Sequence, residues 1–143
     1  MSLEVIPQQR VDTLVTDAGS GEQRRRTEYT GTAWIDGRAE AAGLTLKRIG
    51  QPGMILPGKD VTFFVPDCLP YVREGLERAQ LTVTTAMQAS GDTGAILGAE
   101  AAFVDDPSGS PTWIQLHVSA HSGWPFAVSY RVVALVPPEA VAA

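Results

Sequence analysis

Residues 112–120, with the sequence Thr-Trp-Ile-Gln-Leu-His-Val-Ser-Ala, alternate strictly between two kinds of side chain. The apolar set is Ile114, Leu116, Val118 and Ala120, and the other set is Trp113, Gln115, His117 and Ser119. Successive side chains of a β-strand point to opposite faces, so a period of two predicts a strand with one buried face and one wetter face. This pattern is typical of antiparallel sheets.

The same alternation recurs on both sides of this stretch. It runs through residues 60–65, 81–88 and 127–136, and weaker versions occupy residues 10–17, 28–36, 44–49 and 95–104. Together these segments predict about eight strands whose inward side chains form a common core. The side chains expected in that core are Phe63, Val83, Ile114, Leu116, Val118, Val128, Tyr130 and Val132.

Turn-forming residues separate the predicted strands, and the chain has 14 glycines and 10 prolines in 143 residues. The Pro-Gly pairs at 52–53 and 57–58 predict type II turns, because Pro presets φ and Gly accepts a positive φ. Hairpin loops are expected at 90–94 and 105–111, with a tight corner at 121–125. Residues 80–136 are accordingly predicted to form a four-stranded meander.

Residues 71–80 are charged and break the alternation. We expect at most one short helix there, since Gly75 in its middle costs about 1 kcal/mol relative to Ala. A chain of this size buries about two thirds of its surface on folding, which is sufficient for one core. The prediction is an all-β fold: a single antiparallel β-sandwich domain over residues 1–143, jelly-roll or immunoglobulin-like.

Charge and cysteine usage exclude several classes of protein. The net charge is −5, which disfavours a nucleic-acid partner, and the one basic run, 24–26, is expected in a solvated loop, with a small anion-binding patch as the alternative. Cys68 is the only cysteine, so no internal disulfide forms. We expect Cys68 to be a half-buried apolar side chain, reactive only if a distant His meets it.

No stretch is long and apolar enough to predict a membrane span, and the N-terminal residues lack the basic and apolar regions of a signal peptide. The expected location is therefore the cytoplasm, or a particle into which the chain is incorporated.

The two histidines, His117 and His121, have the spacing of a zinc site on a helix. On a strand the same spacing separates the rings by about 13 Å, so we expect no shared metal ion. Asp105 and Asp106 fit no calcium-loop motif and are expected at a solvated hairpin tip. The sequence predicts no metal site.

Catalytic motifs are also missing from the sequence. There is no Gly-x-Ser-x-Gly elbow and no glycine-rich nucleotide loop, so no catalytic residue and no cofactor are predicted. The sequence leaves open a pair of carboxylates from distant strands that would catalyse glycoside hydrolysis, with Asp36, Glu40 and Glu100 as candidates. The simpler interpretation of Glu100 is an outward residue of its strand.

The outward strand faces carry aromatic side chains. Trp34 shares its face with Thr30 and Thr32, and Phe64 shares its face with Asp60 and Thr62. Sugar rings stack on indole while their hydroxyls meet amide and imidazole groups, so the candidate binding residues are Trp34, Trp113, Gln115 and His117. The alternative is that a loop or a partner subunit covers these aromatics.

These observations favour a non-enzymatic structural or interaction protein, most simply a β-sandwich subunit of a larger assembly of the coat or decoration type. Its partners would be copies of itself or an assembly lattice. The alternative is a carbohydrate-binding module with a glycan partner, and a small hydrolase ranks third. Fold alone does not decide among them.

Overall fold

The computed structural model describes residues 2–36, 44–51, 54–89, 95–121 and 126–142. Within these ranges the chain forms eight strands and two short 3-10 helices. The strands are β1 (Ser2–Thr16), β2 (Gln23–Asp36), β3 (Leu44–Gln51), β4 (Met54–Phe64), β5 (Gln80–Ala89), β6 (Ala95–Asp105), β7 (Thr112–His121) and β8 (Phe126–Val136). The helices are η1 (Leu76–Arg78) and η2 (Pro138–Ala140).

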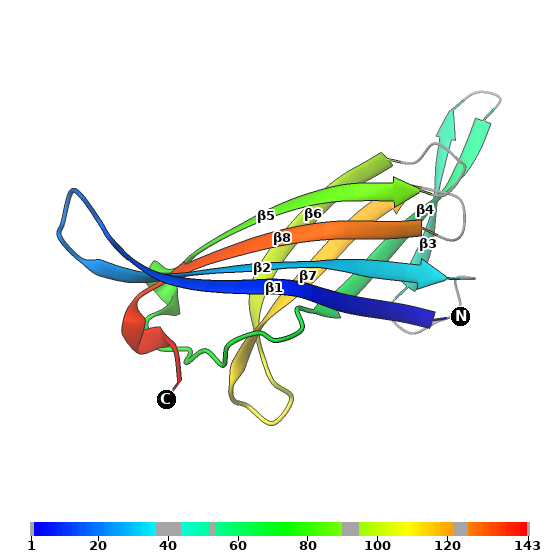
Figure 1. Cartoon of the computed structure of the whole chain (residues 1–143). Coiled ribbons are helices and arrows are strands. Elements are labelled where there is room, and N and C mark those ends of the chain that lie inside the picture. The colour runs from blue at the N-terminus through cyan, green and yellow to red at the C-terminus, as the bar shows by residue number, and fades with distance from the viewer. Residues whose placement is uncertain (1, 37–43, 52–53, 90–94, 122–125, 143) are drawn as a thin grey trace.

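The strands form two four-stranded antiparallel sheets that pack face to face (Figure 1). The order of strands is β1-β2-β8-β5 in the first sheet and β3-β4-β7-β6 in the second. The predicted all-β sandwich of about eight strands is confirmed. The short helix expected near 71–80 is the single 3-10 turn η1. It begins after Gly75, whose φ of 89° is a left-handed conformation that cannot be part of a right-handed helix.

The predicted meander over residues 80–136 is wrong. β6 pairs with β7 as a hairpin, but β5 and β8 pair with each other in the opposite sheet. The chain therefore crosses between the sheets from β5 to β6 and again from β7 to β8. Residues 80–136 therefore supply a central strand to each sheet, β8 to the first and β7 to the second, and the two crossings connect the sheets.

The type II turn predicted at 57–58 is also wrong, because Pro57 lies inside β4 and pairs with Arg48 of β3. The pairing of β4 with β7 stops at Gly58 and His121. Pro57 thus stands where β4 has only one neighbouring strand in the described structure, so its missing N–H breaks no ladder on the other side. The other Pro-Gly pair, 52–53, and the loop 90–94 fall outside the described residues.

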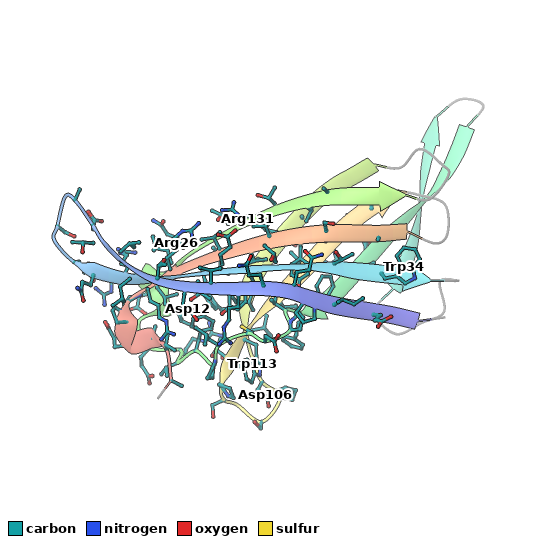
Figure 2. All side chains as sticks on the ribbon, viewed as in Figure 1. Asp12, Arg26, Trp34, Asp106, Trp113 and Arg131 are labelled. Atoms are coloured by element: carbon teal, nitrogen blue, oxygen red, sulfur yellow. The ribbon has the colours of Figure 1, made fainter. Side chains whose placement is uncertain are left out.

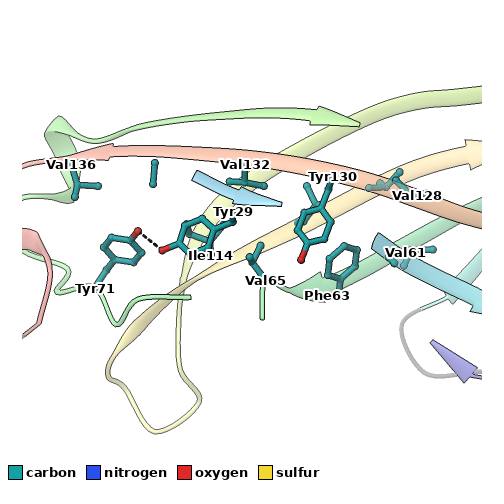
Figure 3. Packing of buried hydrophobic residues seen from close by; sticks show 14 of the residues in the cluster. Tyr29, Val61, Phe63, Val65, Tyr71, Ile114, Val128, Tyr130, Val132 and Val136 are labelled. Atoms are coloured by element: carbon teal, nitrogen blue, oxygen red, sulfur yellow. Dashed lines mark hydrogen bonds between the residues drawn. The ribbon is translucent and has the colours of Figure 1, made fainter. Parts of the chain in front are cut away.

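The core lies between the sheets and follows the predicted parity (Figure 3). Seven of the eight side chains predicted to be inward are buried: Phe63, Ile114, Leu116, Val118, Val128, Tyr130 and Val132. The eighth, Val83, is only partly buried because β5 is an edge strand. Phe63 and Tyr130 join the two sheets edge to face, with ring centroids 5.6 Å apart.

A polar pair closes one end of this core. The hydroxyls of Tyr29 and Tyr71 are 2.7 Å apart (Figure 3). The Tyr29 hydroxyl also accepts a hydrogen bond from the backbone N–H of Leu69. Both rings are 1% exposed. Burial raises the pKa of Tyr71 to about 12 and raises that of Tyr29 further, so both phenols stay neutral at physiological pH. The pair fixes the segment after β4 against the first sheet.

Candidate functional site

Three of the predicted binding residues share one surface. Trp113, Gln115 and His117 alternate with the buried residues of β7, so they point to the outer face of the second sheet. Thr62 and Phe64 of the neighbouring β4 pair with His117 and Gln115 and share that face. Phe64 is 45% exposed, an unusual position for a large aromatic ring.

Trp113 is held by the β6–β7 hairpin loop. Its indole Nε1–H donates to Oδ1 of Asp106 over 3.1 Å, and Asp106 also accepts hydrogen bonds from the hydroxyl and the backbone N–H of Ser108. These donors, with the Ser108 hydroxyl foremost, lower the pKa of Asp106 from its ordinary value. The loop predicted at 105–111 therefore forms as expected and orients the indole (Figure 2).

A cleft opens beside this indole. Its volume is about 350 Å³, and its lining consists of Phe64, Val65, Asp67, Cys68, Asp106 and Trp113. The segment after β4 forms one wall and the β6–β7 loop forms the other. Two aromatic rings and two carboxylates at one opening suit a small ligand with an apolar face and polar edges.

His117 belongs to a polar cluster farther along the same face. Its Nδ1 lies 2.8 Å from Oγ1 of Thr62, and its Nε2 lies 3.6 Å from Oδ1 of Asp60. Ser119 donates its hydroxyl hydrogen to Asp60 rather than to the imidazole, whose Nε2 is 3.4 Å away. A serine nucleophile needs its proton taken by the imidazole, so this arrangement positions side chains and does not activate Ser119.

Trp34 lies on the other side of the molecule. It alternates with buried Ala33 and Tyr29 on β2, so it points to the outer face of the first sheet, near the end of the strand (Figure 2). Trp113 points outward from the second sheet. The structure therefore brings Trp113, Gln115 and His117 together and separates Trp34 from them by the thickness of the sandwich.

The remaining chemical candidates have ordinary surroundings. Burial raises the pKa of the Cys68 thiol, which is the reverse of what a nucleophilic thiol requires. Glu100 is exposed on β6, opposite His117, as an outward strand residue. Glu40 and the side chain of Asp36 lie outside the described residues.

In the part of the chain that the structure describes, no three His, Cys, Asp or Glu side chains lie close enough together to hold a metal ion. His117 and His121 both belong to the strand β7, as expected, so the helical spacing of a zinc site does not apply. The side chain of His121 is not among those described.

The basic run 24–26 lies in β2, so the prediction of a solvated loop is wrong. Strand alternation sends Arg25 to one face and its two neighbours to the other. Arg25 lies 3.7 Å from Asp12, Arg26 lies 3.3 Å from Glu28, and Arg24 donates to the backbone carbonyl of Arg78. The three arginines of the run therefore contact separate acceptors on the two faces of β2.

Sequence reasoning predicted a weak strand at 10–17 but missed that β1 is a long and exposed edge strand. Every residue from Ile6 to Leu14 is exposed. Three of the four exposed large hydrophobic side chains in the described residues are Ile6, Val11 and Leu14, with exposures of 48%, 37% and 64%. The pairing with buried Tyr29 and Thr27 places Arg10 and Asp12 at the inward parity, where charged residues are typical of edge strands.

Comparison with protein-family models, with curated protein sequences and with solved structures found no match to this chain. No helix in the described ranges has the length and apolar character required to cross a membrane.

Proposed function

We propose that this chain is a non-enzymatic β-sandwich subunit of a larger assembly, of the coat or decoration type, which joins its partners through strand edges. The observation that carries the proposal is the exposed edge strand β1, with Ile6, Val11 and Leu14 in solvent. An uncovered edge presents unpaired backbone N–H and C=O groups that accept another strand.

The strand ribbons at the two ends of the sandwich support the same proposal. At one end the β1–β2 ladder continues past Val136, the last residue of β8 that pairs with β2. At the other end residues 48–51 of β3 pair only with residues 54–57 of β4, beyond the last pair with β7 (Figure 1). A two-stranded ribbon is marginally stable alone in water, so ribbons of this kind suit contacts with other molecules.

The test is the mass of the purified protein in solution, measured by sedimentation velocity over a hundredfold range of concentration. A defined oligomer that dissociates on dilution is the expected result, starting from a chain of 15.2 kDa. A species that stays monomeric at the highest concentration would overturn the proposal and favour a binding module.

A second candidate function is carbohydrate binding, and the cleft between Phe64 and Trp113 favours it. The fixed indole and the exposed phenyl ring offer stacking surfaces, while Asp106 and Asp67 line the same opening and can accept hydrogen bonds from sugar hydroxyls. His117 and Gln115 extend this surface along β7.

The cleft is tested by screening an array of glycans with the wild-type chain and two tryptophan variants. Trp113→Ala removes one wall of the cleft, and Trp34→Ala is the matched control on the opposite face. Binding that is lost only in Trp113→Ala is the expected result. Equal loss in both variants, or no glycan bound by the wild type, would exclude this site.

A further inference from the structure

The edge strand β1 is complementary to itself. We propose that two copies of this chain pair β1 with β1 in an antiparallel register centred on Val11, which joins two four-stranded sheets into one continuous sheet. This inference rests on the proposed function, because it names a second copy as the partner of the subunit and β1 as the contact.

The outer side of β1 is open for this pairing. β1 is the first strand of its sheet and bonds to β2 on one side only. Among the described residues, the backbone hydrogen bonds outside the ladders do not involve residues 2–16. The strand contacts the segment after β4 through one of its own side chains, because Arg10 donates to the backbone carbonyl of Asp67 over 2.8 Å.

The charges on β1 select one register. In an antiparallel pair centred on Val11, Arg10 of each copy stands directly opposite Asp12 of the other, and residues opposite one another share a face with Cβ atoms about 5 Å apart. A two-fold axis through Val11 repeats this pair, so the interface contains two opposite-charge contacts. Val11, exposed on the outward parity, meets its own copy at the axis.

Neighbouring registers lose this match. Centring the pair on Asp12 places two carboxylates opposite each other, and centring it on Arg10 places two guanidinium groups opposite each other. Like charges directly opposite are destabilising in a sheet. The register shift between Pro7 and Gln9 and the missing N–H of Pro7 end the pairing on one side, which confines the contact to residues 9–13.

The acidic member of the pair is already oriented. Asp12 accepts a hydrogen bond from the hydroxyl of buried Thr27 over 2.8 Å, and Nε of Arg10 lies 3.5 Å from the other carboxylate oxygen. Both side chains remain partly exposed, at 40% for Arg10 and 30% for Asp12. A second copy therefore meets charges that are already held in place at the edge of the sheet, and little side-chain conformational entropy is lost on pairing.

The experiment uses two charge reversals, Arg10→Asp and Asp12→Arg, with Thr84→Arg on the exposed edge strand β5 as a matched control. In the proposed register each reversal alone places like charges opposite each other in both contacts. Mixing the two variants restores both opposite-charge pairs between different chains. We expect each single variant to self-associate at least tenfold more weakly than wild type, and the equimolar mixture to recover the wild-type constant.

Sedimentation velocity gives the dissociation constants, and circular dichroism verifies that each variant is folded. The β1 register would be overturned if neither reversal weakens self-association, or if the mixture associates no more strongly than the single variants. Either result would leave the proposed assembly function standing. A monomeric wild type would overturn both.

A third measurement does not depend on the variants being folded. Hydrogen exchange of the wild type should show backbone amides of residues 9–13 protected in the dimer and released on dilution. Protection that does not change with concentration would also overturn the register.

Discussion

β8 and β1 belong to one sheet, yet their surroundings are opposite. β8 is central, and its inward side chains, Val128 to Val136, are all at most 3% exposed. β1 is the edge, and its residues from Ile6 to Leu14 are all exposed. The comparison separates two positions in one sheet: β8 pairs with a strand on each side, whereas β1 pairs on one side only. The first two predictions below each contrast a buried residue with an exposed residue of the same type.

The largest effect is expected from Leu116→Ala, with Leu14→Ala as the matched control. Leu116 is fully buried between the sheets, so its loss should lower the free energy of unfolding by about 2–5 kcal/mol. Leu14 is the same residue type at 64% exposure, so its loss should cost less than about 0.5 kcal/mol. Urea titrations of both variants measure the difference. Equal costs would mean that β1 is packed as tightly as the core.

Gly31→Ala tests how β2 supports the edge strand. A Cβ at Gly31 would lie 2.3 Å from the Tyr130 hydroxyl and 2.7 Å from the backbone carbonyl oxygen of Ile6, so the ring and β1 must both move. We expect a loss of about 1–3 kcal/mol, typical of overpacking.

The control for this substitution is Gly98→Ala on β6. A Cβ at Gly98 would meet nothing within 4 Å, so the free energy of unfolding should change by less than about 0.5 kcal/mol. Thermal denaturation compares the two variants, and a harmless Gly31→Ala would show that β1 moves freely relative to β2.

The strand faces were predictable from the sequence because side-chain parity is a local property. Residues 112–120 and 127–136 have the inward and outward sets that their alternation predicts. Strand partners are a non-local property, and the alternation of β5 and β8 fits pairing within either sheet. The meander prediction failed for this reason.

The same limit applies to the candidate site. The alternation predicted that Trp34 and Trp113 both point outward. It could not predict that β2 and β7 belong to different sheets, so that the two indoles lie on opposite outer faces of the sandwich. The cleft beside Trp113 depends on Asp67 and Cys68, which follow β4, and no sequence pattern links that segment to the β6–β7 loop.

The two buried tyrosines give a smaller and more selective contrast. Tyr29→Phe removes one partner of the Tyr71 hydroxyl and the hydroxyl that accepts from the Leu69 N–H, and the loss of these buried hydrogen bonds should cost about 1–3 kcal/mol. The Tyr130 hydroxyl is buried and finds no hydrogen-bond partner among the described residues, so Tyr130→Phe should be neutral or stabilising. Urea denaturation compares the two variants, and a larger cost for Tyr130→Phe would show that its hydroxyl is bonded in solution.

The smallest effect is expected from the ion pairs on the outer face of the first sheet. The Arg131 guanidinium hydrogen-bonds Glu28, and with Arg26 it holds the pKa of that carboxyl below its ordinary value of 4.5, against the opposing effect of burial. A carboxyl whose pKa is lowered by folding adds stability above its unfolded pKa, and this contribution disappears as the pH falls through the folded pKa.

Glu28→Gln should therefore lower Tm at pH 7, and the difference in Tm between this variant and the wild type should be smaller at pH 3. Arg131→Met removes the partner cation, so its difference in Tm from the wild type should also be smaller at pH 3. High salt should reduce the Tm differences of both variants at pH 7, because salt screens surface ion pairs. A gap for Glu28→Gln that widens at pH 3 would mean that Glu28 folds with a raised pKa and contributes through its protonated form.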